Sequence, residues 1–302
     1  MMDYFILMRP TLFIPVWMFF LLGVHFADGS LNFRSISIFI LYTSLMGGVY
    51  ILNQIVDRES DRKNEKLFLL SDEIIPISYA YLEMLLLFII PLGLSILLGK
   101  VIFFYFLLSL FMGITYSLRP LQIKARPFLD LLWNSTGYGF LAFIIGWISV
   151  SNPSYQMWIR GMPYFLVVGA VFANTTIPDI KGDREEGKIT TGVFLGMRKT
   201  LTLGVILDFF ALIASYLFRD YICFILAAIS LPIFIYAAIS TRNKSILLSF
   251  RAPVVILAVE VSIITPIIIP LLLLIFLIQK IYYRKKFNIN YPAIYSGADK
   301  EF

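Results

Sequence analysis

Long apolar runs alternate with polar segments along almost the whole chain. The runs are roughly 17 to 25 residues long, which is the length that a helix needs to cross the hydrocarbon core of a bilayer. We therefore predict an all-α polytopic membrane protein with about nine transmembrane helices. The candidate spans are residues 11–28, 35–56, 78–98, 101–118, 130–150, 162–178, 200–218, 221–240 and 253–279.

The composition supports this fold class and narrows the chemistry. Hydrophobic residues make up 59% of the chain and charged residues only 15%, whereas a soluble domain carries about 25% charged residues. The mean hydropathy is +0.85. Cys223 and His25 are the only cysteine and histidine, which excludes a disulfide framework, a thiolate zinc site and histidine-based catalysis. Any chemistry must use carboxylates, Lys, Arg, Tyr and Asn.

Two acidic clusters lie at the ends of predicted helices. Asp57 and Asp61 follow the second run, and Asp179 and Asp183 follow the sixth, with four residues between the members of each pair. On a helix such side chains project from one face, one turn apart. Because paired carboxylates repel each other, we expect a cation between them, and Mg²⁺ is their usual partner where phosphate also binds. Asn53, one turn before Asp57, is costly in an apolar run unless it meets such a ligand.

The charge distribution predicts the orientation of the helices rather than a nucleic-acid partner. The loops on the N-terminal side hold sixteen Lys and Arg residues and the opposite loops hold four, so the positive-inside rule places both acidic clusters in the cytoplasm. Lys280, Arg284, Lys285 and Lys286 would lie outside if nine helices all cross. Either the bias of the earlier loops dominates, which we favour, or the last segment, interrupted by two prolines, does not fully cross.

The acidic pattern resembles the UbiA superfamily of intramembrane prenyltransferases. The resemblance rests on Asn53, Asp57 and Asp61 after the second helix and on the second acidic pair after the sixth. The Arg-Pro sequence at residues 9–10, the segment Tyr-Ser-Leu-Arg-Pro-Leu-Gln-Ile-Lys at residues 116–124 and the segment 182–188 are similar too. These matches extend over roughly residues 9–200.

The resemblance implies a helical bundle around a central cavity, in which a prenyl chain passes from a prenyl diphosphate to a hydrophobic acceptor, usually aromatic. It implies that Mg²⁺ is the cofactor and that the lipid bilayer surrounds the site. The residues that would bind Mg²⁺ and take part in catalysis are Asp57, Asp61, Asp179 and Asp183, together with Asn53 in catalysis. Neither the acceptor nor the length of the prenyl chain follows from the sequence.

Basic residues near the acidic clusters are candidates for binding the diphosphate: Arg58, Lys63, Lys124 and Arg184. The sequence departs from the family pattern beside this cluster, because Glu-Lys-Leu-Phe follows Asn64 where many relatives have Lys-Pro-x-Arg-Pro. The arginine of that element is missing here, so its contact must come from elsewhere or be absent.

A second departure concerns the segment after helix four. Many relatives place Lys four residues after the tyrosine that corresponds to Tyr116, but Pro120 stands there in this chain. Arg119 precedes it and Lys124 lies further on. The sequence leaves open which of these two binds substrate, and Tyr116 is a candidate substrate contact beside them.

A polar stripe on the predicted fifth helix supplies further candidates. Asp130, Asn134 and Tyr138 are spaced at four-residue intervals, so one face of an apolar helix carries all three. Asn134 and Tyr138 would orient the acceptor or the allylic end of the donor. The alternative is a seam of hydrogen bonds between helices.

The first eight runs divide into two sets of four that place their acidic clusters on the same side, as a parallel duplication would. We expect one transmembrane prenyltransferase domain over residues 1–286, with two four-helix halves and helix nine, and a tail over residues 287–302. Loops 57–77 and 179–199 are expected to cap the cavity, and residues 67–70 to pack on the bundle as a short helix. Because the donor is amphipathic, we expect a lateral opening to the bilayer, which we place between helices one and nine.

Two other functions remain in competition. A carboxylate-based cation transporter would also use intramembrane acids, but near the middle of the bilayer. A phosphatidyl-alcohol transferase would use one contiguous acidic motif with Asp-Gly and Ala-Arg dipeptides, which the sequence lacks. We therefore expect an enzyme of the cell membrane, a prenyltransferase with its active site toward the cytoplasm.

Overall fold

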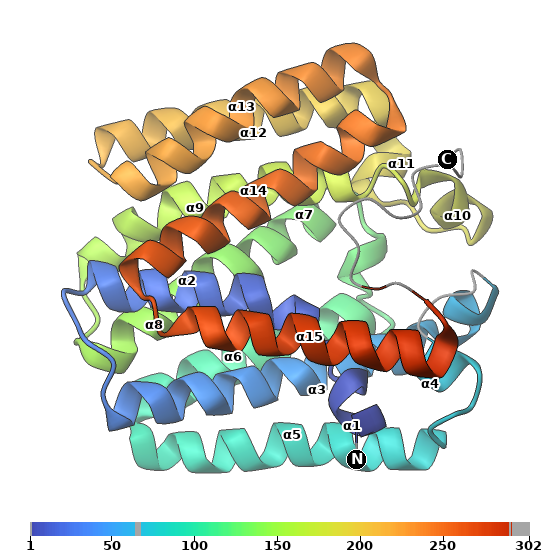
Figure 1. Cartoon of the computed structure of the whole chain (residues 1–302), viewed down its shortest axis with the longest axis horizontal. Coiled ribbons are helices and arrows are strands. Elements are labelled where there is room, and N and C mark those ends of the chain that lie inside the picture. The colour runs from blue at the N-terminus through green and yellow to red at the C-terminus, as the bar shows by residue number, and fades with distance from the viewer. Residues whose placement is uncertain (1, 64–67, 290, 292–302) are drawn as a thin grey trace.

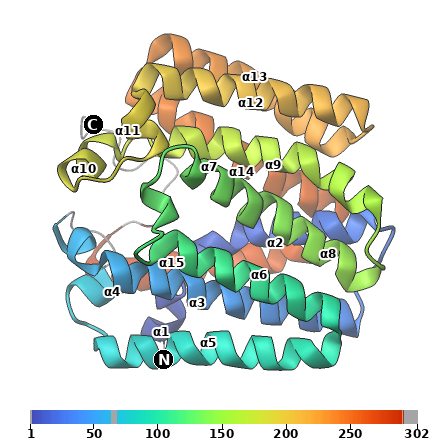
Figure 2. The same cartoon turned by 180° about the vertical axis from the view of Figure 1, so that it is seen from behind.

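The computed structural model describes residues 2–63, 68–289 and 291, and these residues form helices and turns without a strand. The long helices run side by side (Figures 1 and 2). They are α2 (Phe13–Phe26), α3 (Phe33–Lys63), α5 (Ile77–Leu98), α6 (Lys100–Ser117), α9 (Tyr155–Thr175), α12 (Met197–Leu217), α13 (Tyr221–Ser240), α14 (Asn243–Ile264) and α15 (Ile268–Phe287). A further long segment joins α7 (Leu129–Asn134), a π-helix (Ser135–Leu141) and α8 (Ala142–Val150).

Short helices gather at one end of this bundle. Helix α1 (Met2–Leu7) and a 3₁₀ turn (Pro10–Leu12) precede α2, α4 (Phe68–Ser71) follows α3, and a 3₁₀ turn (Ile123–Ala125) follows α6. Helices α10 (Ile180–Glu185) and α11 (Thr191–Leu195) connect α9 to α12. Helices α4 and α10 lie at the same end of the molecule in both views (Figures 1 and 2). The loops expected to cap a cavity thus share one end of the bundle.

The predicted fold class is confirmed. Seven helical segments in the described part of the chain are long and apolar enough to cross a membrane, and the apolar helix that includes α2 is shorter. The first eight predicted runs each correspond to one long helical segment. The count of nine holds only approximately, because the ninth run, 253–279, contains the end of one helix and the start of another. Pro266 lies between them, and it has no N–H to continue the helical hydrogen bonds.

The last helix reverses direction and returns to the end where the N-terminus lies. Lys286 Nζ lies 2.6 Å from Asp3 Oδ1, and the Tyr282 hydroxyl donates to the same oxygen at 2.5 Å. The hydroxyls of Tyr291 and Thr11 are 3.1 Å apart. Figure 1 shows the end of α15 at the end of the bundle that carries α4 and α10.

This reversal corrects the predicted exception to the charge pattern. Lys280, Arg284, Lys285 and Lys286 belong to the last turns of α15, so they lie toward the end that carries the acidic clusters rather than the opposite end. These four residues therefore add to the excess of Lys and Arg on the side of the acidic clusters instead of opposing it. The exception arose from reading two helices as one span.

Two of the four cations at the opposite end stabilise helix termini. The Arg34 guanidinium donates to the carbonyls of Ile148 and Ser149, at the end of α8, and to Leu98, at the end of α5. Arg160 donates to the Phe218 carbonyl, after α12, at 2.6 Å. The last carbonyls of a helix have no partner within the helix and carry partial negative charge, so a guanidinium suits them.

Helices α2 and α8 approach each other until their backbones touch. A Cβ added to Gly23 would lie 1.9 Å from the Phe143 carbonyl oxygen, and one added to Gly146 would lie 1.9 Å from that of Phe20. Small residues allow such close packing in membrane helices, where van der Waals contact replaces the hydrophobic effect between helices. The contact anchors α8, whose preceding π-helix lines the cavity described below.

Candidate active site

A cavity of about 690 Å³ lies between α3, α6, α7, the π-helix and α9, and extends to the segment around α10. Its volume falls within the range of roughly 300–1,000 Å³ that is usual for ligand sites. Charged residues of α3, α10 and the loop after α6 surround one part, and aromatic and apolar residues surround the rest. The cavity therefore joins a charged compartment to an apolar one.

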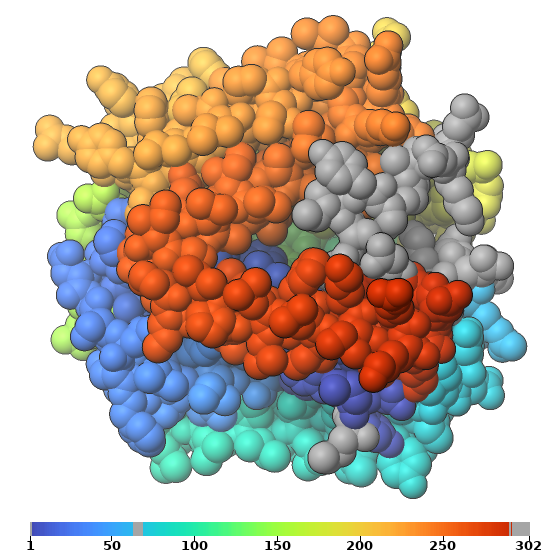
Figure 3. Space-filling model, in the orientation of Figure 1, coloured from blue at the N-terminus to red at the C-terminus, as the bar shows by residue number. Residues whose placement is uncertain are grey.

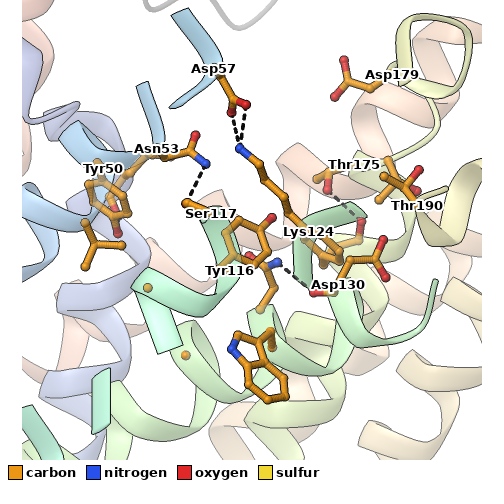
Figure 4. Close-up of a pocket in the computed structure, with 18 of the residues that line it drawn as sticks. Tyr50, Asn53, Asp57, Tyr116, Ser117, Lys124, Asp130, Thr175, Asp179 and Thr190 are labelled. Carbon is orange, nitrogen blue, oxygen red and sulfur yellow. Dashed lines mark hydrogen bonds and ion pairs between the residues drawn. The ribbon is translucent and has the colours of Figure 1, made fainter. Parts of the chain in front are cut away.

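Most of the predicted site residues line this cavity, although they come from segments far apart in the sequence. The lining contains Asn53, Asp57, Asp61, Tyr116, Lys124, Asn134, Tyr138, Asp179 and Asp183. Figure 4 shows Asp57 and Asp179 on opposite sides of the pocket. Both acidic clusters thus line one cavity, while the duplication of two halves and the chemical roles of these residues stay predictions.

Helix α3 carries the first acidic cluster on its own last turns. The helix continues to Lys63, so Asp57 and Asp61 belong to it rather than to the following loop. Tyr50, Asn53 and Asp57 come at intervals of three and four residues, and all line the cavity. One face of one helix therefore presents an aromatic ring, an amide and two carboxylates in order toward the charged compartment.

Lys124 holds the carboxylate of Asp57. Its Nζ lies 2.6 Å from both oxygens, and the two side chains are 9% and 20% exposed. Burial lowers the pKa of Lys124, and the charge of Asp57 opposes this shift. Asn53 lies against Ser117. The amide orientation that satisfies every neighbour has its nitrogen donating to Asp57 Oδ2 at 3.2 Å and its oxygen accepting from Lys124 at 3.2 Å.

The second acidic cluster belongs to α10. Asp179 immediately precedes this helix and Asp183 lies within it. Thr190 Oγ1 donates to Asp183 Oδ2 at 3.1 Å. Burial, and then the negative charge of Asp179, raise the pKa of Asp183 to about 6. A cation close to such a carboxyl would favour its ionised form.

Lys188 joins the end of α10 to the first acidic cluster, and the sequence pattern did not single it out as a site residue. Its Nζ lies 2.7 Å from Glu186 Oε2 and 3.9 Å from Asp57 Oδ1. Burial opposes its charge, but the hydrogen bond to Glu186 and the charge of Asp57 outweigh burial and raise its pKa. Ser60 of α3 also hydrogen-bonds Glu186. The place of Lys188 directly after Gly187 was the only signal in the sequence, because Asp57 lies on a distant helix.

Asp130 fixes the segment that follows α10. Both of its oxygens accept hydrogen bonds from Thr191, one from the backbone N–H at 2.7 Å and one from the hydroxyl. Asp130 is 1% exposed, and its backbone carbonyl accepts from Asn134 at 2.9 Å. Asp130 thus clamps α11 to α7, which is the structural alternative considered for this stripe, while Asn134 and Tyr138 line the cavity.

The π-helix shapes the apolar compartment. Such segments are rare and commonly occur at functional sites. Here it brings Gly137 and Tyr138 to the cavity, and a Cβ added to Gly137 would meet no atom within 4 Å. Tyr138 stacks on Tyr50 of α3, with ring centroids 6.2 Å apart and an angle of 10° between the planes. Two aromatic faces therefore flank the space beneath the carboxylates.

Four basic residues predicted to bind substrate have other positions. Arg58 donates to the Leu70 carbonyl and pairs with Glu73 at 2.6 Å, so it ties α4 to α3 instead of lining the cavity. Arg119 and Arg184 are exposed and are not among the lining residues. The side chain of Lys63 lies outside the described residues. Residues next to each other on a helix or turn point in different directions, so a basic residue beside a cavity-lining acid in the sequence need not line the cavity itself.

The donor set suits a hard divalent cation. All candidate ligands offer oxygen, from four carboxylates and one amide, which Mg²⁺ prefers. In the described part of the chain, no three acidic, Cys or His side chains converge closely enough to hold a metal by themselves. Mg²⁺ usually binds through one or two carboxylates and completes its shell with water and substrate phosphate, so these oxygens would supply only part of its shell.

Comparison with known proteins identifies the relatives of this chain. The sequence model of the UbiA prenyltransferase family matches residues 14–246. A lycopene elongase/hydratase of Corynebacterium glutamicum is 34% identical over 100 residues, which are 33% of this chain and 35% of that protein. The chloroplastic 2-acyl-4-prenylphloroglucinol 6-prenyltransferase of Humulus lupulus is 28% identical over 182 residues, 57% of this chain and 44% of that protein. The matched region thus spans less than half of the length of either relative.

A solved structure shares the fold. The structure of a UbiA homologue from Archaeoglobus fulgidus bound to GPP and Mg²⁺ superposes with a TM-score of 0.67, covering 86% of this chain and 98% of that one at 18% identity. At this identity the likeness concerns the fold, and it extends over nearly all of the bundle.

Proposed function

The chain belongs to the UbiA prenyltransferase family, and from that premise we propose that it transfers a prenyl group from a prenyl diphosphate to a hydrophobic acceptor within the membrane. In the reaction the donor's allylic C–O bond breaks and diphosphate leaves. A bond forms from the allylic carbon to the acceptor, which loses a proton. The products are the prenylated acceptor, diphosphate and H⁺, so no oxidant or reductant is needed.

One observation carries this proposal: two pairs of carboxylates line one cavity whose interior is apolar and aromatic. A diphosphate is repelled by bare carboxylates, so the arrangement requires bridging cations. Asp57 and Asp61 from α3 and Asp179 and Asp183 from α10 would hold Mg²⁺. The bound metal supplies positive charge that stabilises the departing diphosphate.

Lysines take the place of the arginine that the family pattern supplies after the first acidic motif. Lys124 and Lys188 both line the cavity and both lie near Asp57. An ammonium group binds phosphate oxygen as a point charge. With a metal ion on Asp57, these ammonium groups would be available to the diphosphate oxygens. Of the two candidates after helix four, Lys124 and not Arg119 would then contact the substrate.

The apolar compartment protects the reactive end of the donor. An allylic cation reacts with water, so its site has to be closed and dry. The stacked rings of Tyr50 and Tyr138 line the same cavity as the carboxylates, and an aromatic face attracts a cation electrostatically. Tyr116 and Asn134 line the same region and would orient the reacting groups.

The site opens toward the cytoplasm of a cell membrane in this proposal. The excess of Lys and Arg at the end that carries α4 and α10 supports this orientation through the positive-inside rule. The amphipathic donor enters from the side. An apolar groove of about 510 Å³ between α14 and α15, with Ile14 of α2 at its wall, supports this route. Figure 3 shows the hollow between α14 and α15.

The competing functions are disfavoured. A cation transporter would bind its ion near the middle of the bundle, whereas these carboxylates lie at the end of α3 and in α10. A phosphatidyl-alcohol transferase would belong to a different family. Family membership and the position of the acids therefore favour transfer of a prenyl group.

The test is an assay of the purified protein with labelled prenyl diphosphates of several lengths and a panel of aromatic, porphyrin-type and lipid acceptors. We expect a prenylated product only when Mg²⁺ is present, and EDTA should abolish both product formation and binding of the donor. Donor binding that survives removal of divalent cations, or the absence of any product from the whole panel, would contradict the proposal.

A further inference from the structure

The cavity continues below the carboxylates as a limb along α3 and α6. We call this limb the α3–α6 branch. Its walls contain no charged residue, and they are built from Tyr42, Met46, Val49, Ser109, Met112 and Gly113. The methionines can adapt to an irregular apolar chain. A compartment of this composition suits a hydrocarbon ligand and offers little to a polar one.

The branch ends at a floor made by Tyr42 and Ser109. Their hydroxyl oxygens are 3.5 Å apart. Behind the floor, the Tyr42 ring packs on Phe106 with centroids 5.5 Å apart. Ile38, Ile102 and Phe106 are at most 1% exposed, so the core closes the branch on that side.

The depth of the branch follows from the helix that forms its wall. Eleven positions separate Asn53, one turn below Asp57, from Tyr42, which corresponds to about 16 Å along α3 at about 1.5 Å per residue. An extended chain advances about 1.2 Å per bond, as an extended polypeptide does. An isoprene unit adds four bonds to the length, or about 5 Å by the same measure. The branch thus has room for about three units.

Helices α3 and α6 pack closely at Gly113. A Cβ added there would lie 2.6 Å from both methyl groups of Val49, so these two residues form one continuous part of the wall. Among the residues named for the branch, Tyr42 and Ser109 alone carry polar side chains. Tyr42 lies eleven positions along α3 from Asn53, so this hydroxyl pair is placed to contact the tail of a donor rather than its diphosphate.

We propose that Tyr42 and Ser109 end the α3–α6 branch and so set the longest isoprenoid tail that it accepts at about three isoprene units, a farnesyl chain. This inference rests on the proposed function and deepens it. A longer tail meets the floor, and forcing extra carbons into a packed site costs about 1–3 kcal/mol. A geranylgeranyl donor therefore binds at least about tenfold more weakly than a farnesyl donor.

A position in the lining outside α3 and α6 gives a matched control. Gly137 belongs to the π-helix and lines the cavity, as do Phe172 and Thr175 of α9. A Cβ added to Gly137 would meet no atom within 4 Å. A larger residue there fills space beside the π-helix rather than beside α3 and α6, so it tests whether the length limit belongs to the α3–α6 branch.

The experiment measures binding in the presence of Mg²⁺, without acceptor, by competition against labelled geranyl diphosphate. The competitors are dimethylallyl, geranyl, farnesyl and geranylgeranyl diphosphates. For the unaltered protein we expect a loss of affinity of about tenfold or more between farnesyl and geranylgeranyl. In Ser109→Leu the ratio of dimethylallyl to farnesyl affinity should rise about tenfold, because the larger side chain shortens the branch. Gly137→Leu should leave the length at which affinity drops unchanged.

A variant that gains affinity serves as a further test, because misfolding cannot explain a gain. Tyr42→Ala removes the ring at the floor, and we expect it to bring geranylgeranyl affinity to within about threefold of farnesyl affinity, which a loss of stability does not produce. Two results would overturn this inference and leave the proposed function standing. One is equal affinity for farnesyl and geranylgeranyl diphosphates in the unaltered protein. The other is a length limit that moves in Gly137→Leu and not in the floor variants. If none of the four diphosphates binds with Mg²⁺, the proposed function fails together with it.

Discussion

The Nζ of Lys124 lies 2.6 Å from both carboxylate oxygens of Asp57, although 67 positions separate the two residues. The pair is mostly buried, with 9% and 20% of the side chains exposed. A buried ion pair of this kind costs desolvation energy that a salt bridge at the surface does not. We infer that the pair serves the site rather than stability, since the same carboxylate is a candidate metal ligand and the same ammonium group a candidate diphosphate contact.

Lys124→Ala should weaken donor binding strongly. A hydrogen bond to a charged group contributes about 1.5–3 kcal/mol, so we expect affinity for a prenyl diphosphate in the presence of Mg²⁺ to fall by about 10-fold to 150-fold. Arg119→Ala is the matched control, because Arg119 is exposed and does not line the cavity. Titration with the donor measures both. Greater loss in Arg119→Ala than in Lys124→Ala would reverse the assignment between these two residues.

Asp61→Ala and Asp183→Ala should each abolish transfer while the protein stays folded in detergent. Each change removes a proposed metal ligand and leaves the diphosphate charge uncompensated, so the loss should appear mainly in kcat. Glu59→Ala provides the control, since Glu59 is an exposed acid on the same turn of α3 and does not line the cavity. Turnover at saturating donor is the measurement. Near-normal turnover in both Asp variants would mean that the clusters are surface charge.

Asp130→Asn should destabilise the protein through the clamp between α7 and α11. The Asp130 carboxylate accepts two hydrogen bonds from Thr191. A hydrogen bond to a charged group contributes about 1.5–3 kcal/mol to stability, and the neutral amide of Asn loses the charge. We expect a lower unfolding temperature in detergent and weaker donor binding, because α11 follows Lys188 and Thr190 in the chain. Thr136→Val, on the exposed side of the same helical segment, should change neither property.

Cysteine labelling can test the reversal of the chain at Pro266. Cys223 is fully buried, so the unaltered protein should resist a membrane-impermeant thiol reagent. Lys285→Cys and Asp72→Cys occupy exposed positions toward the same end of the bundle, and Ser30→Cys lies in an exposed turn at the other end. In oriented vesicles, Lys285→Cys should react from the same side as Asp72→Cys. Labelling of Lys285→Cys together with Ser30→Cys would show that α15 ends on the opposite side.

Several features of the chain were predictable because they depend on local or one-dimensional constraints. A bilayer demands helices of a certain length, so the apolar runs predicted the fold class and the ends of α5, α6 and α13 to within one or two residues. Four-residue spacing places Asp57 and Asp61 on one helical face wherever that helix lies. The expected short helix after the first cluster is present as α4, which buries Leu69 and Leu70.

The neighbours of each charged side chain were not predictable in the same way. Arg58 lies beside Asp57 in the sequence yet pairs with Glu73 and Leu70, whereas Lys124 and Lys188 reach Asp57 from distant segments. Rotation about a helix axis turns adjacent residues by roughly 100°, so nearness in sequence does not imply a shared cavity. Only the packing of α3 against the loops after α6 and α10 selects the partners.

By itself, then, the sequence determined that the protein is a helical membrane protein with two acidic clusters, because hydrophobic length and helical spacing are properties of single segments. The tertiary structure alone decided that Pro266 separates two helices running in opposite directions and that Asp130 clamps Thr191. It alone also brought Tyr42 of α3 and Ser109 of α6 together in the lining of one cavity. These outcomes depend on contacts between helices, and such contacts arise only when the bundle packs and each buried polar group finds a partner.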